Sequence, residues 1–127
     1  MTREEPDALA SMLRSLDPQL RPGRFVFTTV DAVPDEVDCI ATVTEDEGVT
    51  LVVAQDQADR AGLRYDYVAA MITLRVRSDL ASVGLTAAVA STLATAGVSC
   101  NVIAGHFHDH LFVPFDRGEE AVELLRP

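Results

Sequence analysis

Residues 84–115 decide the fold, and they read GLTAAVASTLATAGVSCNVIAGHFHDHLFVPF. Leu85, Val89 and Leu93 recur at intervals of four, which predicts a helix over residues 84–96 with one buried side. Gly97 then provides a residue suited to end that helix. Two runs of β-forming residues follow, at 98–104 and 110–115, and predict strands. The polar residues between them, at 105–109, predict a hairpin connection.

The flanking residues extend this stretch to the order β-α-β-β-α. Residues 71–77 alternate apolar and polar side chains and predict a strand before the helix. Residues 119–126 predict a final helix that turns Val122 and Leu125 inward. The order is that of a ferredoxin-like βαββαβ plait without its last strand. The missing strand must therefore come from elsewhere.

The first half of the chain supplies a candidate for the missing strand. Residues 24–30 are β-formers without an obvious partner, and we expect them to complete the C-terminal sheet. A hairpin is predicted from strands 40–44 and 49–54, followed by a short helix at 55–61 that ends at Gly62. The sequence thus predicts an α+β fold of two half-similar units that share or complete one antiparallel sheet.

The N-terminal segment is predicted to be helical. Leu9, Met12, Leu13 and Leu16 share one face of an amphipathic helix, which we end near Leu16 because Pro18 follows. Residues 21–23 then form a turn. We divide the chain into a helix and turn, a degenerate first unit and a second unit, at residues 1–23, 24–66 and 67–127.

Composition narrows the classes of partner. The 127 residues are 48% hydrophobic and 24% charged, with 10 basic and 20 acidic residues and a net charge of −10. All basic residues are arginine. So acidic a chain is repelled by phosphate backbones and lacks a basic surface for anionic membranes, so we expect neither partner. The N-terminus lacks the apolar run of a signal peptide, and we expect a cytoplasmic protein.

Two motifs resemble a known family. The run DLASVGL at 79–85, the Ala-rich helix after it, and AGVSCNVI at 96–103 resemble an ACT domain. More narrowly, RVRSDLASVGLTAAVA at 75–90, HDHLFVP at 108–114 and EGVTLV at 47–52 resemble small stand-alone bacterial ACT-like proteins without an assigned activity. The resemblance implies tandem ACT-like units acting as a non-catalytic regulatory module, which dimerises and binds an amino acid or similar metabolite at an interface without a cofactor.

The candidate ligand site is the loop that begins the predicted helix. The first N–H groups of a helix are free and lie at the positive end of its dipole, which suits a carboxylate. Gly84 would allow close approach, and the Asp79 carboxylate could accept from an ammonium group. The full candidate set is Asp79, Ser82, Val83, Gly84, Leu85, Thr86 and Asn101. The alternative is structural: Asp79 or Ser82 caps the helix, Gly84 packs on the sheet, and Asn101 bonds a loop.

Other clusters point more weakly to chemistry. His106, His108 and His110 would share one face of a continuous strand, but a hairpin at Gly105 and Asp109 scatters them, so no metal site is predicted. Cys39 and Cys100 have no metal-ligand spacing and are expected to be small buried thiols. No catalytic motif is present, which leaves a Cys100–His108 pair as the enzyme alternative.

The predicted helix at 84–96 also bears on assembly. Its outward residues are small and uncharged: Thr86, Ala87, Ala90, Ser91 and Ala94. A helix on a sheet normally carries charges on its outer side. We therefore expect a homodimer that packs through this helix. A structural dimerisation or partner-binding module without a ligand is the alternative to a sensing module.

Overall fold

The computed structural model describes residues 10–77 and 83–127, and the candidate residues Asp79 and Ser82 lie outside these ranges. The described residues form a 7-stranded sheet in the order β3-β4-β2-β5-β7-β6, with β1 also paired to β5. The strands are β1 Pro18–Leu20, β2 Phe25–Val30, β3 Cys39–Glu45, β4 Gly48–Ala54, β5 Val68–Leu74, β6 Asn101–Ala104 and β7 Asp109–Pro114. The helices are α2 Gln55–Arg60, α3 Leu85–Thr95 and α4 Gly118–Leu125, with a 3-10 turn at Phe115–Arg117. Residues 10–14 are helical as well.

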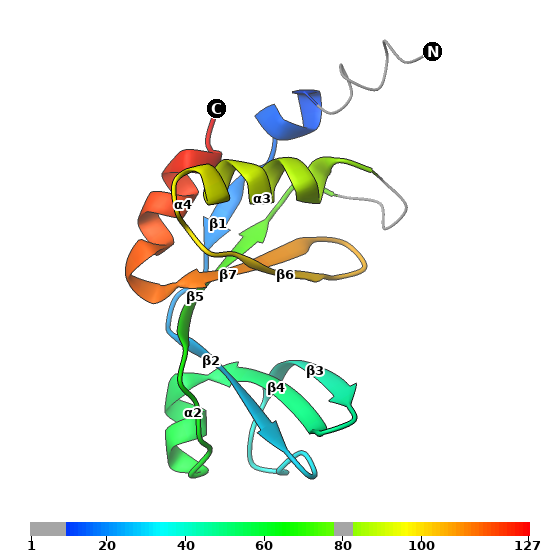
Figure 1. The fold of residues 1–127 in the computed structure, drawn as a ribbon, viewed down its shortest axis with the longest axis vertical. Helices are drawn as coiled ribbons and strands as arrows, with labels where there is room; N and C mark the ends of the chain where they lie inside the picture. The colour runs from blue at the N-terminus through cyan, green and yellow to red at the C-terminus, as the bar shows by residue number, and fades with distance from the viewer. Residues whose placement is uncertain (1–9, 78–82) are drawn as a thin grey trace.

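Two ferredoxin-like plaits share this sheet, as predicted. In the C-terminal unit, the strand order is β1-β5-β7-β6, and α3 and α4 cover one face of these strands. In the N-terminal unit, the strand order is β5-β2-β4-β3, and the helix is α2. Strand β5 belongs to both, because β2 pairs with Val68 and Ala69 while β1 pairs with residues 72–74. Figure 1 shows β5 running from the N-terminal unit, which contains α2, into the C-terminal unit beneath α3. The two units are therefore joined by a continuous ladder of strands.

The strand that completes the C-terminal plait is mainly β1, which corrects the sequence prediction. Residues 24–30 share the sheet, as expected, but only Phe25 and Val26 pair with β5. The backbone N–H of Arg21 donates to the Met71 carbonyl at 2.8 Å, and that of Arg75 donates to the Asp17 carbonyl at 3.1 Å. The backbone N–H and C=O groups of residues 17, 19 and 21 thus point toward β5, whereas those of residue 18 point to the open edge. Proline is tolerated there because no ladder hydrogen bond needs its missing N–H. Pro18 was used only to end the predicted helix near Leu16, and no strand was predicted over residues 18–20, although an edge strand tolerates proline.

Strand β5 also lies three residues earlier than predicted. We expected residues 71–77, from their alternation, but the strand is Val68–Leu74. All its residues from Ala69 to Leu74 are buried, with Ala70, Ile72 and Leu74 in one core and Ala69 and Met71 in another. A strand covered on both faces shows no alternation. The alternation was read from Thr73, Arg75 and Arg77, but Thr73 is buried, and the two exposed arginines follow the end of the strand.

The core consists of one layer per unit and a layer between the units. Helices α3 and α4 cover Ile72, Leu111 and neighbouring side chains, whereas α2 covers the smaller cluster around Val26 and Leu51. Between the units, the Phe27 ring meets the edge of the Phe112 ring, with centroids 5.3 Å apart and planes at 83°. This geometry is favourable for aromatic pairs. It ties β2 of one unit to β7 of the other.

Candidate functional site

The predicted ligand loop enters α3 with an unusual backbone. Gly84 is the N-cap residue and has φ 103°, in the left-handed region that favours glycine. No side chain of a described residue caps the helix, and its first turn contains no acidic residue. Val83 is 92% exposed, Thr86 is exposed, and Leu85 is buried in the core. Among the described residues, no side chain therefore satisfies the first N–H groups of α3, which lie at the positive end of the helix dipole.

Asn101 lies away from this loop within one chain. It is the exposed first residue of β6, and it pairs with Phe112, which pairs with Met71. Gly84 begins α3, whereas Asn101 follows its far end, and an 11-residue helix is about 16 Å long. Figure 1 shows β6 starting near the end of α3 that is opposite to Gly84. A site that uses both residues therefore needs a second chain.

The outer side of α3 and the edge of β6 are open to such a chain. The exposed residues of α3 are Thr86, Ala87, Ser91, Thr92, Ala94 and Thr95, none of them charged. Strand β6 ends the described sheet and pairs only with β7 among the described strands. Hydrogen bonds from Arg117 stabilise the C-terminal end of α3. Gly97 has φ 75°, and Arg117 donates to the Gly97 carbonyl at 2.8 Å and to the Ala96 carbonyl at 3.2 Å.

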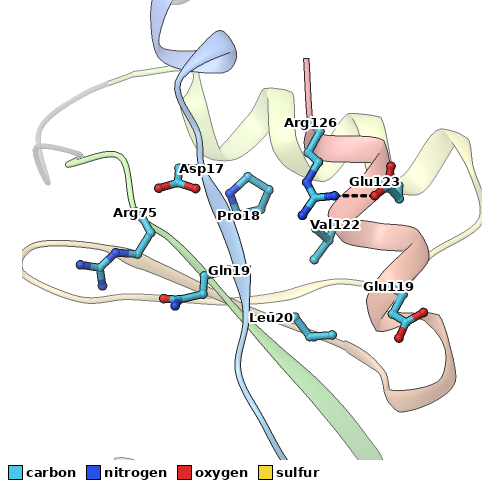
Figure 2. Close-up of a pocket in the computed structure, with 9 residues that line it drawn as sticks. All are labelled: Asp17, Pro18, Gln19, Leu20, Arg75, Glu119, Val122, Glu123 and Arg126. Atoms are coloured by element: carbon cyan, nitrogen blue, oxygen red, sulfur yellow. Dashed lines mark hydrogen bonds and ion pairs between the residues drawn. The ribbon is translucent and has the colours of Figure 1, made fainter.

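A groove that the sequence analysis missed lies beside β1. It has a volume of about 720 Å³ and is lined by Asp17, Pro18, Gln19, Leu20, Arg75, Glu119, Val122, Glu123 and Arg126. Figure 2 shows Pro18 and Leu20 on β1 with Val122 of α4 beside them, and Glu123 paired with Arg126 at 2.6 Å. Asp17 has φ 47°, a rare value for a residue other than glycine. The groove depends on β1 being a strand, which is why the sequence carried no signal for it.

The histidines lie in and after the hairpin between β6 and β7, as the sequence predicted. His110 is on β7, and its Nδ1 lies 3.0 Å from the Thr73 hydroxyl oxygen. His106 and His108 precede β7, and the His106 ring packs against the edge of the Phe107 ring. Within the described ranges, no three His, Cys, Asp or Glu side chains come close enough to hold a metal ion.

The two cysteines are free thiols and half-buried, whereas the sequence analysis expected them to be buried. Burial raises the pKa of the Cys100 thiol. A thiol with a raised pKa is a poor nucleophile near neutral pH. No helix in residues 10–77 and 83–127 is long and apolar enough to cross a membrane.

The strand orders of the two units define a pair of ferredoxin-like plaits. The chain belongs to the ACT domain family: one ACT domain model matches residues 7–70 and a second matches residues 67–127. The two matches meet at the start of β5, the strand that both units share. A search of curated proteins finds no match to this sequence.

Solved structures agree with this assignment. A protein of unknown function from Vibrio cholerae, VC0802, described as a possible transport protein, is 40% identical, with a TM-score of 0.85 and 96% of each chain covered. The regulatory subunit of aspartate kinase from Thermus thermophilus, in its ligand-free form, has a TM-score of 0.62 at 12% identity, covering 88% of this chain and 96% of that one. The second likeness concerns the fold alone. ACT domains are regulatory, so the chain is a regulatory module in general terms.

Proposed function

We propose that this chain is a non-catalytic sensor that binds an amino acid or a similar small metabolite between two copies of itself. In each of two equivalent sites, the loop ending at Gly84 of one copy faces the β6 strand of the other, near Asn101. The ligand carboxylate accepts from the first N–H groups of α3, and Asp79 accepts from the ligand ammonium group. The observation that carries the proposal is the left-handed entry to α3 at Gly84, where no side chain of a described residue caps the helix.

Two further observations support a site shared between copies. Gly84 and Asn101 lie at opposite ends of α3 in one chain, so a single copy leaves the site half built. The outer side of α3 is uncharged in a chain with a net charge of −10. A surface without charges can be buried without desolvating ions.

The assembly is tested by light scattering at micromolar concentration. We expect a mass of twice 13.7 kDa for the wild type. Ala87→Glu places a charge on the outer side of α3 and should shift the mass toward that of one chain, whereas Ala87→Gln, of similar size, should leave the dimer intact. If the wild type has the mass of one chain at these concentrations, the proposal of a site shared between two copies fails.

The ligand is tested by calorimetric titration with the twenty amino acids. Gly84→Ala places a side chain where φ is 103°. The matched control is Gly62→Ala in the N-terminal unit, where φ is 69° and no atom lies within 4 Å of the carbon added at residue 62. Both substitutions introduce left-handed strain, which costs about 1–2 kcal/mol. Only Gly84→Ala should weaken ligand binding.

Asn101→Ala should also weaken binding, with little loss of stability because the side chain is exposed. Asp79→Asn should weaken an amino acid far more than its deaminated acid, since only the ammonium contact is lost. If no amino acid binds the wild type with a Kd below about 1 mM, the sensing role fails and a dimerisation module without a ligand replaces it.

A further inference from the structure

A polar row crosses the helix-free face of the C-terminal unit. Gln19 of β1, Thr73 of β5 and His110 of β7 are directly opposite one another in the strand register. Alternate residues of a strand share a face and lie about 7 Å apart. Arg21 and Arg75 therefore flank this row on the same face, since Arg21 is level with Met71 and Arg75 with Asp17. Figure 2 shows the Gln19 amide and the Arg75 guanidinium on the same side of β1.

A chain of hydrogen bonds fixes the centre of the row. Arg21 Nη1 donates to the Thr73 hydroxyl oxygen at 3.3 Å, and that oxygen lies 3.0 Å from His110 Nδ1. Thr73 accepts from arginine, which can only donate, so its own proton is free to go to Nδ1 of neutral His110. The imidazole proton is then on Nε2, pointing away from Thr73. Thr73 is 1% exposed, which holds the arrangement in place.

Gly105 leaves room beside this imidazole. A side-chain carbon at residue 105 would lie 3.3 Å from His110 Nε2 and 2.8 Å from the His108 carbonyl oxygen. The second distance is too short for any side chain to fit without a backbone shift. Nε2 of His110 therefore points toward Gly105, which follows β6, and away from Thr73, so the imidazole acts on this face through Nδ1.

The arginines on this face form no ion pair with a carboxylate of the described residues, although Asp17 lies opposite Arg75. Three arginines elsewhere, Arg60, Arg117 and Arg126, pair with an acidic residue of their own helix or turn. No ion pair in the described part of the chain involves Arg21 or Arg75. Burial, His108 and Arg21 lower the pKa of His110, in that order, whereas Asp109 raises it.

Two carboxylates lie near these cations. Asp109 precedes His110 on β7 and is buried on the opposite face of the sheet. Asp17 is level with Arg75 across the ladder. In a chain with twice as many acids as bases, this face gathers positive charge that an anion would offset.

We propose that Arg21, Arg75 and Gln19 form a cradle beside Thr73 that binds a small dianionic group, either a phosphate monoester or a dicarboxylate. The two guanidinium groups approach the anion from opposite sides, and the Gln19 amide donates between them. Thr73 is a positioning residue, because it orients Arg21 and His110. The cradle contains none of the residues of the interface site, so the two proposals stand or fall separately.

The test is calorimetric titration of the full chain with inorganic phosphate and, separately, with succinate, at constant ionic strength set by sodium chloride. We expect at least one of them to bind with a Kd below about 10 mM. Arg75→Gln and Arg21→Gln should each weaken that binding about tenfold or more. Arg64→Gln, which removes an exposed arginine from the N-terminal unit, should leave it unchanged.

The two ligands separate the sources of the anion. Binding of phosphate alone assigns the cradle to phosphate esters, binding of succinate alone assigns it to dicarboxylates, and binding of both supports the shared chemistry. A ligand-dependent shift of the Gln19 side-chain amide resonance, reduced in Thr73→Val, would place the anion in the cradle. The proposal is overturned if neither phosphate nor succinate binds. It is also overturned if Arg64→Gln weakens anion binding as much as Arg21→Gln and Arg75→Gln do. Arg75 carries the test if Arg21→Gln does not fold, since its side chain makes no described hydrogen bond.

Discussion

The N-terminal and C-terminal units have matching strand orders but different helices. In the C-terminal unit, the 11-residue helix α3 connects the first two strands of the plait. In the N-terminal unit, residues 31–38 form an irregular connection at the same place, and the one helix, α2, has 6 residues. The N-terminal unit therefore has no helix end that corresponds to Gly84. Of the two plaits, only the C-terminal one has the helix end on which the proposed ligand site depends, and the shared sheet joins it to the other.

The difference also shows how the two units depend on each other. Neither plait has four strands of its own, because β5 is the last strand of one unit and the first strand of the other. Each unit alone would leave a row of unpaired backbone groups along β5, which is costly. The two ACT units should therefore unfold together, although they differ in the size of their cores.

The largest expected effect comes from the side chain that joins the units. Phe112 is fully buried and packs against Phe27 of the other unit. Phe112→Ala should cost about 3–5 kcal/mol of unfolding free energy, and chemical denaturation should show one transition for both units. Phe107→Ala is the matched control, because Phe107 is 52% exposed and should cost far less. Two separate transitions in the variant would show that the units are independent.

The sequence predicted the C-terminal unit better than the N-terminal connection. Helix α3 was predicted from Leu85, Val89 and Leu93, and all three are buried in the core. The hairpin between β3 and β4 was predicted from its turn, and Glu45 does pair with Gly48. These features are local, since spacing along the chain determines which residues face inward.

Features that depend on distant parts of the chain were missed. Strand β1 contains Pro18 and only three residues, so its identity rests on its pairing with β5. The cradle beside Thr73 joins residues on or next to β1 and β5, and Arg21 and Thr73 are 52 positions apart. No local pattern reports such a contact. The loop that ends at Gly84 could be identified from the local sequence. Its separation from Asn101 within one chain could not, because that separation depends on how β6 pairs with β7.

A smaller effect would test how closely α4 packs on the shared strand. A side-chain carbon at Gly118 would lie 2.8 Å from Cβ of Ala70 on β5, which is too close. Gly118→Ala should therefore cost about 1–3 kcal/mol through overpacking. The double variant Gly118→Ala with Ala70→Gly should recover part of that loss, measured by denaturant titration. Additive losses in the double variant would show that the contact is not the cause.

A still smaller effect concerns the C-terminal end of α3. Arg117 joins this end to α4 by bonding the Gly97 and Ala96 carbonyls and pairing with Glu120 at 2.8 Å. The hydrogen bond from Arg117 lowers the pKa of Glu120. A carboxyl whose pKa is lowered by folding stabilises the protein above its unfolded pKa, and the contribution is lost as the pH falls through the folded value.

The melting temperature of Glu120→Gln should therefore lie below that of the wild type at pH 7, and the difference should shrink as the pH falls below about 4. The effect should be modest because both side chains are partly exposed. Glu119→Gln is a control on the same turn of α4, and its described contacts do not include Arg117. A difference that grows as the pH falls would contradict this account of Arg117.

The smallest expected effect would show whether a polar group at the junction of the units contributes to stability. Tyr67 lies just before β5 and packs near Phe27, with ring centroids 6.4 Å apart. Its hydroxyl is buried and has no partner at hydrogen-bond geometry among the described residues. Burial raises the pKa of Tyr67, and the nearby Ser99 side chain offsets this in part.

A buried hydroxyl without a good partner has lost its bonds to water and gained little in return. Tyr67→Phe keeps the ring and should change the unfolding free energy by less than about 1 kcal/mol, in the stabilising direction. Ser99→Ala should be neutral for the same reason, since the serine is exposed. If Tyr67→Phe is instead destabilising by more than about 1 kcal/mol and Ser99→Ala matches it, the two hydroxyls form a real bond. The junction between the two ACT units would then be held by that polar contact as well as by Phe27 and Phe112.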